Sequence, residues 1–277
     1  MAGIPTSAAN PALLEAVLRR DRLIVAGGLA LVALLAWAWT LTGAGTGMSM
    51  TAMTERSGMP GAMGMGMAMP VAWTPAYAVL MVFMWWIMMI AMMVPAASPM
   101  ILLFATFNRK QRELGNPHVA TGVFVAGYLL VWAVFSLVAT GVQWGLEQTG
   151  ILTPMMAVGS TYLAASVLIV AGLYQLTPLK QACLRHCRSP LDFISRHWRP
   201  GPIGALRMGI DHGAWCLGCC WFLMGLLFVG GIMNIYWITG LALYVLIEKA
   251  VPYGHAISRM VGVALAAWGV ALIAGLA

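Results

Sequence analysis

Apolar stretches long enough to cross a lipid bilayer recur along the whole chain, and they restrict what it can fold into. Hydropathy identifies seven of them, each close to the roughly 20 residues that span a hydrocarbon core. Only 8% of the side chains are charged, against about 25% in a soluble domain. The sequence therefore predicts an all-α membrane protein, a bundle of about seven transmembrane helices. The stretches lie near residues 23–41, 76–107, 119–142, 157–176, 208–230, 235–251 and 259–276.

The basic residues predict how this bundle is oriented. If the N-terminus is cytoplasmic, 14 of the 15 Lys and Arg residues fall on the cytoplasmic side, and Arg56 is the exception. Cytoplasmic loops of membrane proteins carry such an excess. We therefore expect a multi-pass protein of the bacterial inner membrane, with a cytoplasmic N-terminus and a periplasmic C-terminus. The net charge of +7 is explained by this topology and does not indicate a nucleic-acid partner.

The pattern divides the chain into three parts. Residues 1–42 form an N-terminal tail and the first membrane helix, which we expect to be an anchor and not a cleaved signal peptide. Residues 43–75 form a Met/Gly-rich periplasmic loop. Residues 76–277 form a six-helix membrane domain, and a basic cytoplasmic loop rich in Cys and His interrupts it at 177–207.

The periplasmic loop is unusually rich in methionine. Residues 48–69 hold eight of the 22 methionines, interspersed with Gly, Ala, Ser and Pro. This composition disfavours a helix and leaves a flexible chain of thioethers. Thioethers are soft, neutral donors that suit Cu(I) and bind hard cations poorly. The loop is thus predicted to capture a soft metal; a low-complexity linker or a surface lying on the lipid is the alternative.

A methionine stripe continues into the second apolar stretch. At 100° per residue, Met81, Met84, Met88 and Met92 fall within an arc of about 80° and descend about 16 Å along a helix. These residues are candidate metal ligands, and ordinary packing is the alternative. Pro95 lies beyond the stripe in the same stretch.

Pro95 and Pro99 together predict either a kinked helix or a segment that is broken and re-enters the membrane. Each proline would leave a backbone carbonyl without its usual helical partner, next to Ser98.

The cysteines are concentrated between residues 183 and 220. Cys183 and Cys187 lie at i, i+4 in the cytoplasmic loop, and the fifth apolar stretch opens with further metal-ligand side chains at helical spacing. Thiolate and imidazole could hold Cu(I) at low coordination, or Zn(II) in a Cys3His tetrahedron. Small buried cysteines without a metal are the alternative. The candidates in this stretch are Met208, Asp211, His212, Cys216, Cys219 and Cys220.

Three charged residues lie within or at the ends of the apolar stretches. Asp211 follows Arg207 by four residues, so it is expected either to pair with Arg207 on the helix surface or to draw a cation toward His212. Lys249 is expected to extend toward water at the inner interface. Its neighbour Glu248 could be a ligand, a proton carrier or without a role.

Several runs of residues resemble an uncharacterised bacterial family of predicted metal-binding multi-pass integral membrane proteins. The resemblance covers roughly residues 75–275 and implies a membrane protein and a metal, without naming the metal or an activity. The matching runs are MMVPAASPMILLFA at 92–105, YQLTPLKQACLRHCRSPL at 174–191, MGIDHGAWCLGCCWFLM at 208–224 and GIMNIYW at 231–237, followed by Glu248 and Lys249.

The leading hypothesis is a protein that handles or transports Cu(I), through outer methionines and inner Cys/His ligands, with a copper chaperone or a copper enzyme as partner. The chain has no GxxxxGK[ST] motif and is not itself an ATP-driven pump. A role other than catalysis is favoured. Two alternatives stay open. One is a thiol-disulfide oxidoreductase that uses Cys216 and Cys219 with a quinone. The other is an assembly subunit of a respiratory or copper enzyme that contains structural Zn(II).

Overall fold

The secondary structure is helical in the computed structural model, which describes residues 11–46, 49–57, 72–113, 120–153 and 156–276. An isolated β-bridge between Leu152 and Val158 is the exception. The helices are α1 (Pro11–Leu41), α2 (Met50–Ser57), α3 (Pro75–Glu113), α4 (Thr121–Gln148), α5 (Thr161–Leu176), α6 (Pro178–Arg188), α7 (Pro190–His197), α8 (Gly201–Gly225), α9 (Leu227–Gly230), α10 (Ile235–Ala250) and α11 (Gly254–Ile273).

Five segments in the described part of the chain are long and apolar enough to cross a membrane. A sixth span results if α5 and α6, which meet at a bend of 64°, are counted as one. The predicted span at 235–251 is the 16-residue helix α10, about 24 Å long and so shorter than the roughly 30 Å core. The described part of the chain is thus helical, with a sixth candidate span where α5 and α6 are counted together. The five single spans lie at Arg22–Leu41, Pro75–Gln111, Thr121–Gln148, Gly201–Gly230 and Gly254–Ile273.

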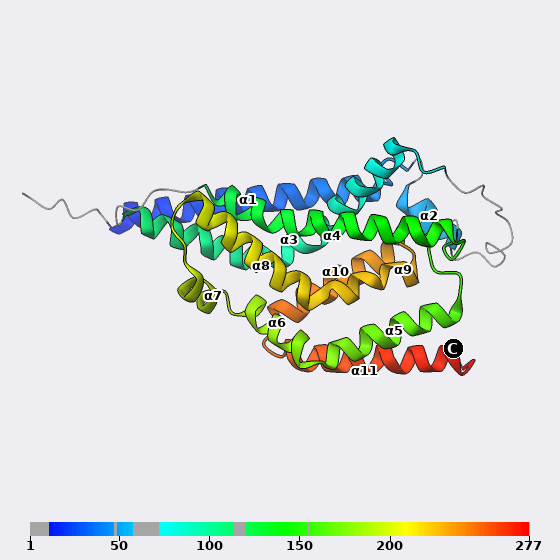
Figure 1. Cartoon of the computed structure of the whole chain (residues 1–277). Helices are drawn as coiled ribbons and strands as arrows, with labels where there is room; N and C mark the ends of the chain where they lie inside the picture. The colour runs from blue at the N-terminus through cyan, green and yellow to red at the C-terminus, as the bar shows by residue number, and fades with distance from the viewer. Residues whose placement is uncertain (1–10, 47–48, 58–71, 114–119, 154–155, 277) are drawn as a thin grey trace, which may run out of the picture.

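The long helices lie side by side along a common direction (Figure 1). One edge of the bundle is formed by α1, α3 and α4, and the opposite edge by the neighbouring helices α5 and α11. Helices α8 and α10 lie between these two edges. Helix α7 and the start of α8 lie at one end of the bundle, and α2, α9 and the C-terminus at the other.

The two prolines of α3 do not interrupt it. The segment from Pro75 to Glu113 is one continuous helix with Pro95 and Pro99 inside it, so the expected broken, re-entrant segment is not formed. Pro99 has no N–H to donate to the carbonyl of Pro95, and the Ser98 hydroxyl donates to that oxygen at 2.8 Å instead. The hydroxyl thus satisfies a carbonyl that the proline leaves free in an apolar setting.

Two regions expected to be loops contain helices. Within the Met/Gly-rich segment, residues 50–57 form α2, so the expectation that composition disfavours a helix is wrong there; residues 47–48 and 58–71 lie outside the described residues. The basic segment 177–207 folds into α6, α7 and the start of α8. In α6, Thr177 is the N-cap and accepts from the Lys180 N–H, and Pro178 occupies the first turn. Both are helix-start signals.

Helices α4 and α8 approach closely because glycines face each other where they cross. A Cβ added at Gly209 of α8 would collide with the Phe124 carbonyl oxygen, and one at Gly127 of α4 would collide with the Leu206 carbonyl oxygen. Small residues at such crossings let helix backbones pack in a membrane. This close contact brings the first turns of α4 against the cysteine-bearing turns of α8.

Candidate metal centre

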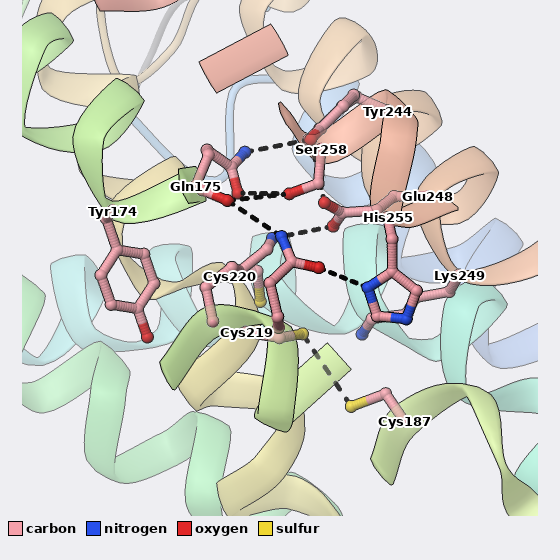
Figure 2. Close-up of polar contacts among 12 residues, drawn as sticks. Tyr174, Gln175, Cys187, Cys219, Cys220, Tyr244, Glu248, Lys249, His255 and Ser258 are labelled. Carbon is pink, nitrogen blue, oxygen red and sulfur yellow. Dashed lines mark hydrogen bonds and ion pairs between the residues drawn. The ribbon is translucent and has the colours of Figure 1, made fainter. Parts of the chain in front are cut away.

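Four of the five cysteines gather between α6 and α8. The Cys187 and Cys219 sulfurs lie 3.9 Å apart (Figure 2), and Cys216 lies one helical turn before Cys219 and Cys220 on α8. The Cys219 and Cys220 thiols both donate to the Cys216 carbonyl at 3.0 Å. Three of these cysteines are buried and Cys187 is partly buried. We call Cys187, Cys216, Cys219 and Cys220 the thiol cluster.

Two side chains from other helices contact the Cys216 sulfur. The Lys249 ammonium of α10 donates to it at 2.9 Å, and the Tyr128 hydroxyl of α4 lies 3.1 Å from it. Lys249 was expected to extend toward water, but its side chain turns into the bundle. An ammonium at this distance stabilises negative charge on sulfur, and does so most strongly where water is excluded.

His212 lies one helical turn before Cys216 and is buried among aromatic rings. Its ring centroid is 5.7 Å from that of Tyr128 and 5.6 Å from that of Phe193. The His212 Nδ1 is buried and has no hydrogen-bond partner in the described part of the chain. Most buried polar atoms are hydrogen-bonded, so an unpartnered imidazole nitrogen next to the thiol cluster is a donor available to a ligand.

The described residues do not form a ready multidentate site for a metal ion. Among them, no group of three or more His, Cys, Asp or Glu side chains is arranged to hold a metal ion. The donors that lie nearest each other are thiol sulfurs, which are soft. The chemistry of this set fits a metal that accepts two soft ligands better than it fits a preformed Cys3His tetrahedron.

The remaining candidates near the cluster have other contacts in the described residues. The Met208 sulfur accepts from the Arg199 N–H at 3.4 Å. Asp211 forms an ion pair with Arg199 at 3.9 Å, so the expected pairing with Arg207 is wrong. The Cys183 sulfur packs against Gly218 and forms no hydrogen bond with the thiol cluster within the described residues.

The methionine stripe of α3 faces the interior. Met81, Met84, Met88 and Met92 are each at most 1% exposed. These side chains therefore contact other helices and not lipid. The structure fits both packing and ligand roles for them, because neither requires exposure in the resting bundle.

Tyr128 connects this stripe to the thiol cluster. Its hydroxyl lies 3.3 Å from the Met93 carbonyl of α3 and 3.1 Å from the Cys216 sulfur of α8. One side chain thus links the backbone of α3, one residue beyond Met92, to the thiol cluster. Sequence reasoning missed Tyr128 because its only sequence signal is one hydroxyl within an apolar run.

A buried polar network lies on the other side of Lys249. Glu248 pairs with Lys180 of α6 at 2.9 Å and accepts from the Tyr244 hydroxyl at 2.9 Å. Gln175 donates to Tyr244 at 3.0 Å, and Ser258 donates to Gln175 (Figure 2). Glu248 is therefore fully partnered, which favours a structural role for it over metal ligation.

The comparison with known proteins gives one family. A family model described as PpoB2, copper chaperone, matches residues 82–272. No curated protein and no solved structure matches the chain. The matched segment runs from α3 to α11 and includes the thiol cluster, His212, Tyr128 and Lys249.

Proposed function

The chain belongs to the PpoB2 family of copper chaperones, and from that membership we propose that it carries Cu(I) as its cargo in the bacterial inner membrane. The outer methionines collect the ion, the methionine stripe of α3 passes it inward, and the thiol cluster with His212 binds it for transfer to a copper chaperone or a copper enzyme. The proposal includes seven membrane passages, with a cytoplasmic N-terminus and a periplasmic C-terminus.

The observation that carries the proposal is the buried sequence of soft donors between α3 and α8. Four thioethers lie on the face of α3 that is buried within the bundle. Tyr128 joins the backbone of that helix to Cys216. Cu(I) accepts thioether and thiolate ligands at low coordination number. A path made of such donors lets the ion move between sites without passing through bare hydrocarbon.

Lys249 supports Cu(I) binding at the inner end through its charge. Cu(I) held by two thiolates carries a net charge of −1, which is costly inside a membrane unless it is paired. The Lys249 ammonium, 2.9 Å from the Cys216 sulfur, supplies the opposite charge. Asp211, already paired with Arg199, and Cys183 are peripheral to this centre in the proposal.

The test is metal content of the detergent-purified chain, offered Cu(I) and Zn(II) in competition under reducing conditions. We expect the native chain to retain copper and a Cys216→Ser/Cys219→Ser variant to lose it. Cys183→Ser is the matched control, because its sulfur packs against Gly218, and it is expected to retain copper.

The alternatives give different results in the same experiment. Tightly held, non-exchanging zinc with no copper would support an assembly subunit with structural Zn(II). Absence of both metals, together with reversible oxidation of the thiols by a quinone, would support the oxidoreductase. In that case two cysteine pairs are tested as the reactive pair. The first is Cys187 and Cys219, whose sulfurs lie 3.9 Å apart, and the second is Cys216 and Cys219.

A further inference from the structure

A polar site lies near the outer end of the bundle, far along α3 from the thiol cluster. Its centre is the buried side chain of Gln143 on α4. The Gln143 Nε2 lies 3.6 Å from the Met81 sulfur and 3.7 Å from the Met156 sulfur. Two thioethers from distant parts of the chain thus converge on one nitrogen atom.

A carboxylate, that of Glu147, also contacts the Gln143 nitrogen. The same Gln143 nitrogen donates to Glu147 Oε1 at 2.8 Å, and the Trp73 indole donates to Glu147 Oε2 at 2.7 Å. Glu147 is only partly exposed, and no Lys, Arg or His pairs with it in the described part of the chain. A partly buried carboxylate without a cation is unfavourable near hydrocarbon.

The orientation of the Gln143 amide is fixed by its other end. The Trp85 indole N–H donates to Gln143 Oε1 at 2.8 Å. An indole N–H can only donate, so the amide oxygen faces Trp85 and the amide nitrogen faces the two sulfurs and Glu147. That nitrogen has two hydrogens, whereas three acceptors surround it: the two sulfurs and the Glu147 oxygen. At least one of these acceptors therefore receives no hydrogen bond from it.

Met156 is held toward this site in an unusual backbone conformation. Its φ is 56°, one of two positive values at non-glycine residues in the described chain. Such conformations are uncommon for methionine and concentrate at functional sites. The Met156 carbonyl accepts from the Ile232 N–H at 3.3 Å, and the Val158 N–H donates to the Phe228 carbonyl at 2.8 Å. These bonds fix the segment against α9 and the turn that follows it.

We propose that Met81, Met156 and Glu147 form an outer binding site for a soft monovalent cation, Cu(I) or its analogue Ag(I), with the Gln143 amide occupying the centre when no ion is bound. The inference rests on the proposed function and adds the place where the ion first enters the bundle. One carboxylate neutralises a charge of +1, so the loaded site is uncharged, as a membrane position requires. The two thioethers select soft ions over Zn(II) or Mg(II).

The experiment uses the full chain in detergent with carbon-13-labelled methionine methyl groups, titrated with Ag(I) and followed by NMR. Met81 and Met156 are assigned from Met81→Leu and Met156→Leu. We expect both methyl signals to shift together, with one midpoint. Glu147→Gln, which keeps an acceptor for Trp73, is expected to raise that midpoint concentration at least about tenfold.

Matched controls separate this site from others. Met100→Leu removes another buried methionine of α3, about 28 Å further along the helix, and is expected to leave the midpoint unchanged. Zn(II) should not move either signal. Cys216→Ser/Cys219→Ser should leave the outer midpoint intact, so that failure of the inner centre and failure of the outer site are distinguishable.

Three results would overturn the proposal. The first is that Met81 and Met156 remain unshifted while other methionine signals saturate with Ag(I). The second is that the two signals shift with different midpoints. The third is that Glu147→Gln titrates like the native chain. In every sample the dispersion of the remaining methyl signals reports whether the chain is folded.

Discussion

Lys180 and Glu248 meet inside the bundle with no exposed side-chain surface. Burying two charges is costly, and their attraction offsets the cost only with good geometry and further hydrogen bonds. Here Glu248 also accepts from Tyr244 at 2.9 Å. Removing one partner leaves the other charge buried and alone, whereas removing both leaves no charge to solvate.

We therefore expect Glu248→Leu to destabilise the chain by about 3–5 kcal/mol. The Lys180→Met/Glu248→Leu double variant should regain much of that loss. Thermal unfolding of the detergent-purified variants measures both effects. A single variant as stable as the native chain would show that the pair contributes nothing to stability.

The types of functional residue could be predicted from the sequence, and their partners could not. The spacing of Met81, Met84, Met88 and Met92 indicated one helix face, and that face is buried. The contacts of Lys249 and Tyr128 with Cys216 join residues 33 and 88 positions apart. Such contacts depend on which helices pack together, and helical periodicity contains no information on that.

At the scale of elements, the long apolar helices were predicted closely and the short ones were missed. Hydropathy finds a helix that must bury its backbone in lipid, which explains the agreement for α3 and α4. The segments α6 and α7 are short and polar, so hydropathy alone overlooks them. Their start signals were present in the sequence as Thr177-Pro178 and Ser189-Pro190.

The crossing of α4 and α8 depends on the absence of side chains at its closest point. Gly209→Leu would force the backbones apart, because a Cβ there already collides with the Phe124 carbonyl oxygen. We expect a loss of about 1–3 kcal/mol of stability, as for overpacked interiors. Copper retention should fall as well, since Tyr128 would move away from Cys216. Thermal unfolding and metal content measure the two effects.

Gly225→Ala is the matched control on the same helix. An added Cβ at Gly225 meets nothing within 4 Å, so stability and copper content should stay close to native values. Equal losses of stability and copper content in both variants would mean that α8 tolerates no substitution. The effect of Gly209→Leu could then not be assigned to the crossing of α4 and α8.

At the scale of the whole molecule, one end of the bundle carries the basic segments. Helix α7 and the start of α8 lie there, and α2 lies at the opposite end (Figure 1). The basic residues of the sequence predict that this end is cytoplasmic, because the charge asymmetry of membrane proteins follows topology. The number of crossings is harder to predict, since the 16-residue helix α10 packs between longer helices and length alone does not settle its position.

Orientation can be tested by labelling with a thiol reagent that does not cross membranes. In a background with all five cysteines replaced by serine, Thr51→Cys should react in intact spheroplasts. Ser195→Cys should react only after the membrane is opened. Both positions are exposed. The reverse pattern would place the N-terminus outside and invert the proposed direction of the path.

The methionine interior also affects how long the protein survives. Oxidation turns an apolar thioether into a polar sulfoxide, which disrupts a packed core. In the folded bundle Met81, Met84, Met88 and Met92 have almost no surface, so oxidants dissolved in water do not reach them. A chain that opens exposes all four at once, and each sulfoxide then opposes repacking. For this protein, we expect unfolding in an oxidising medium to leave sulfoxides that hinder refolding until a reductase removes them, so a closed bundle protects its own methionines.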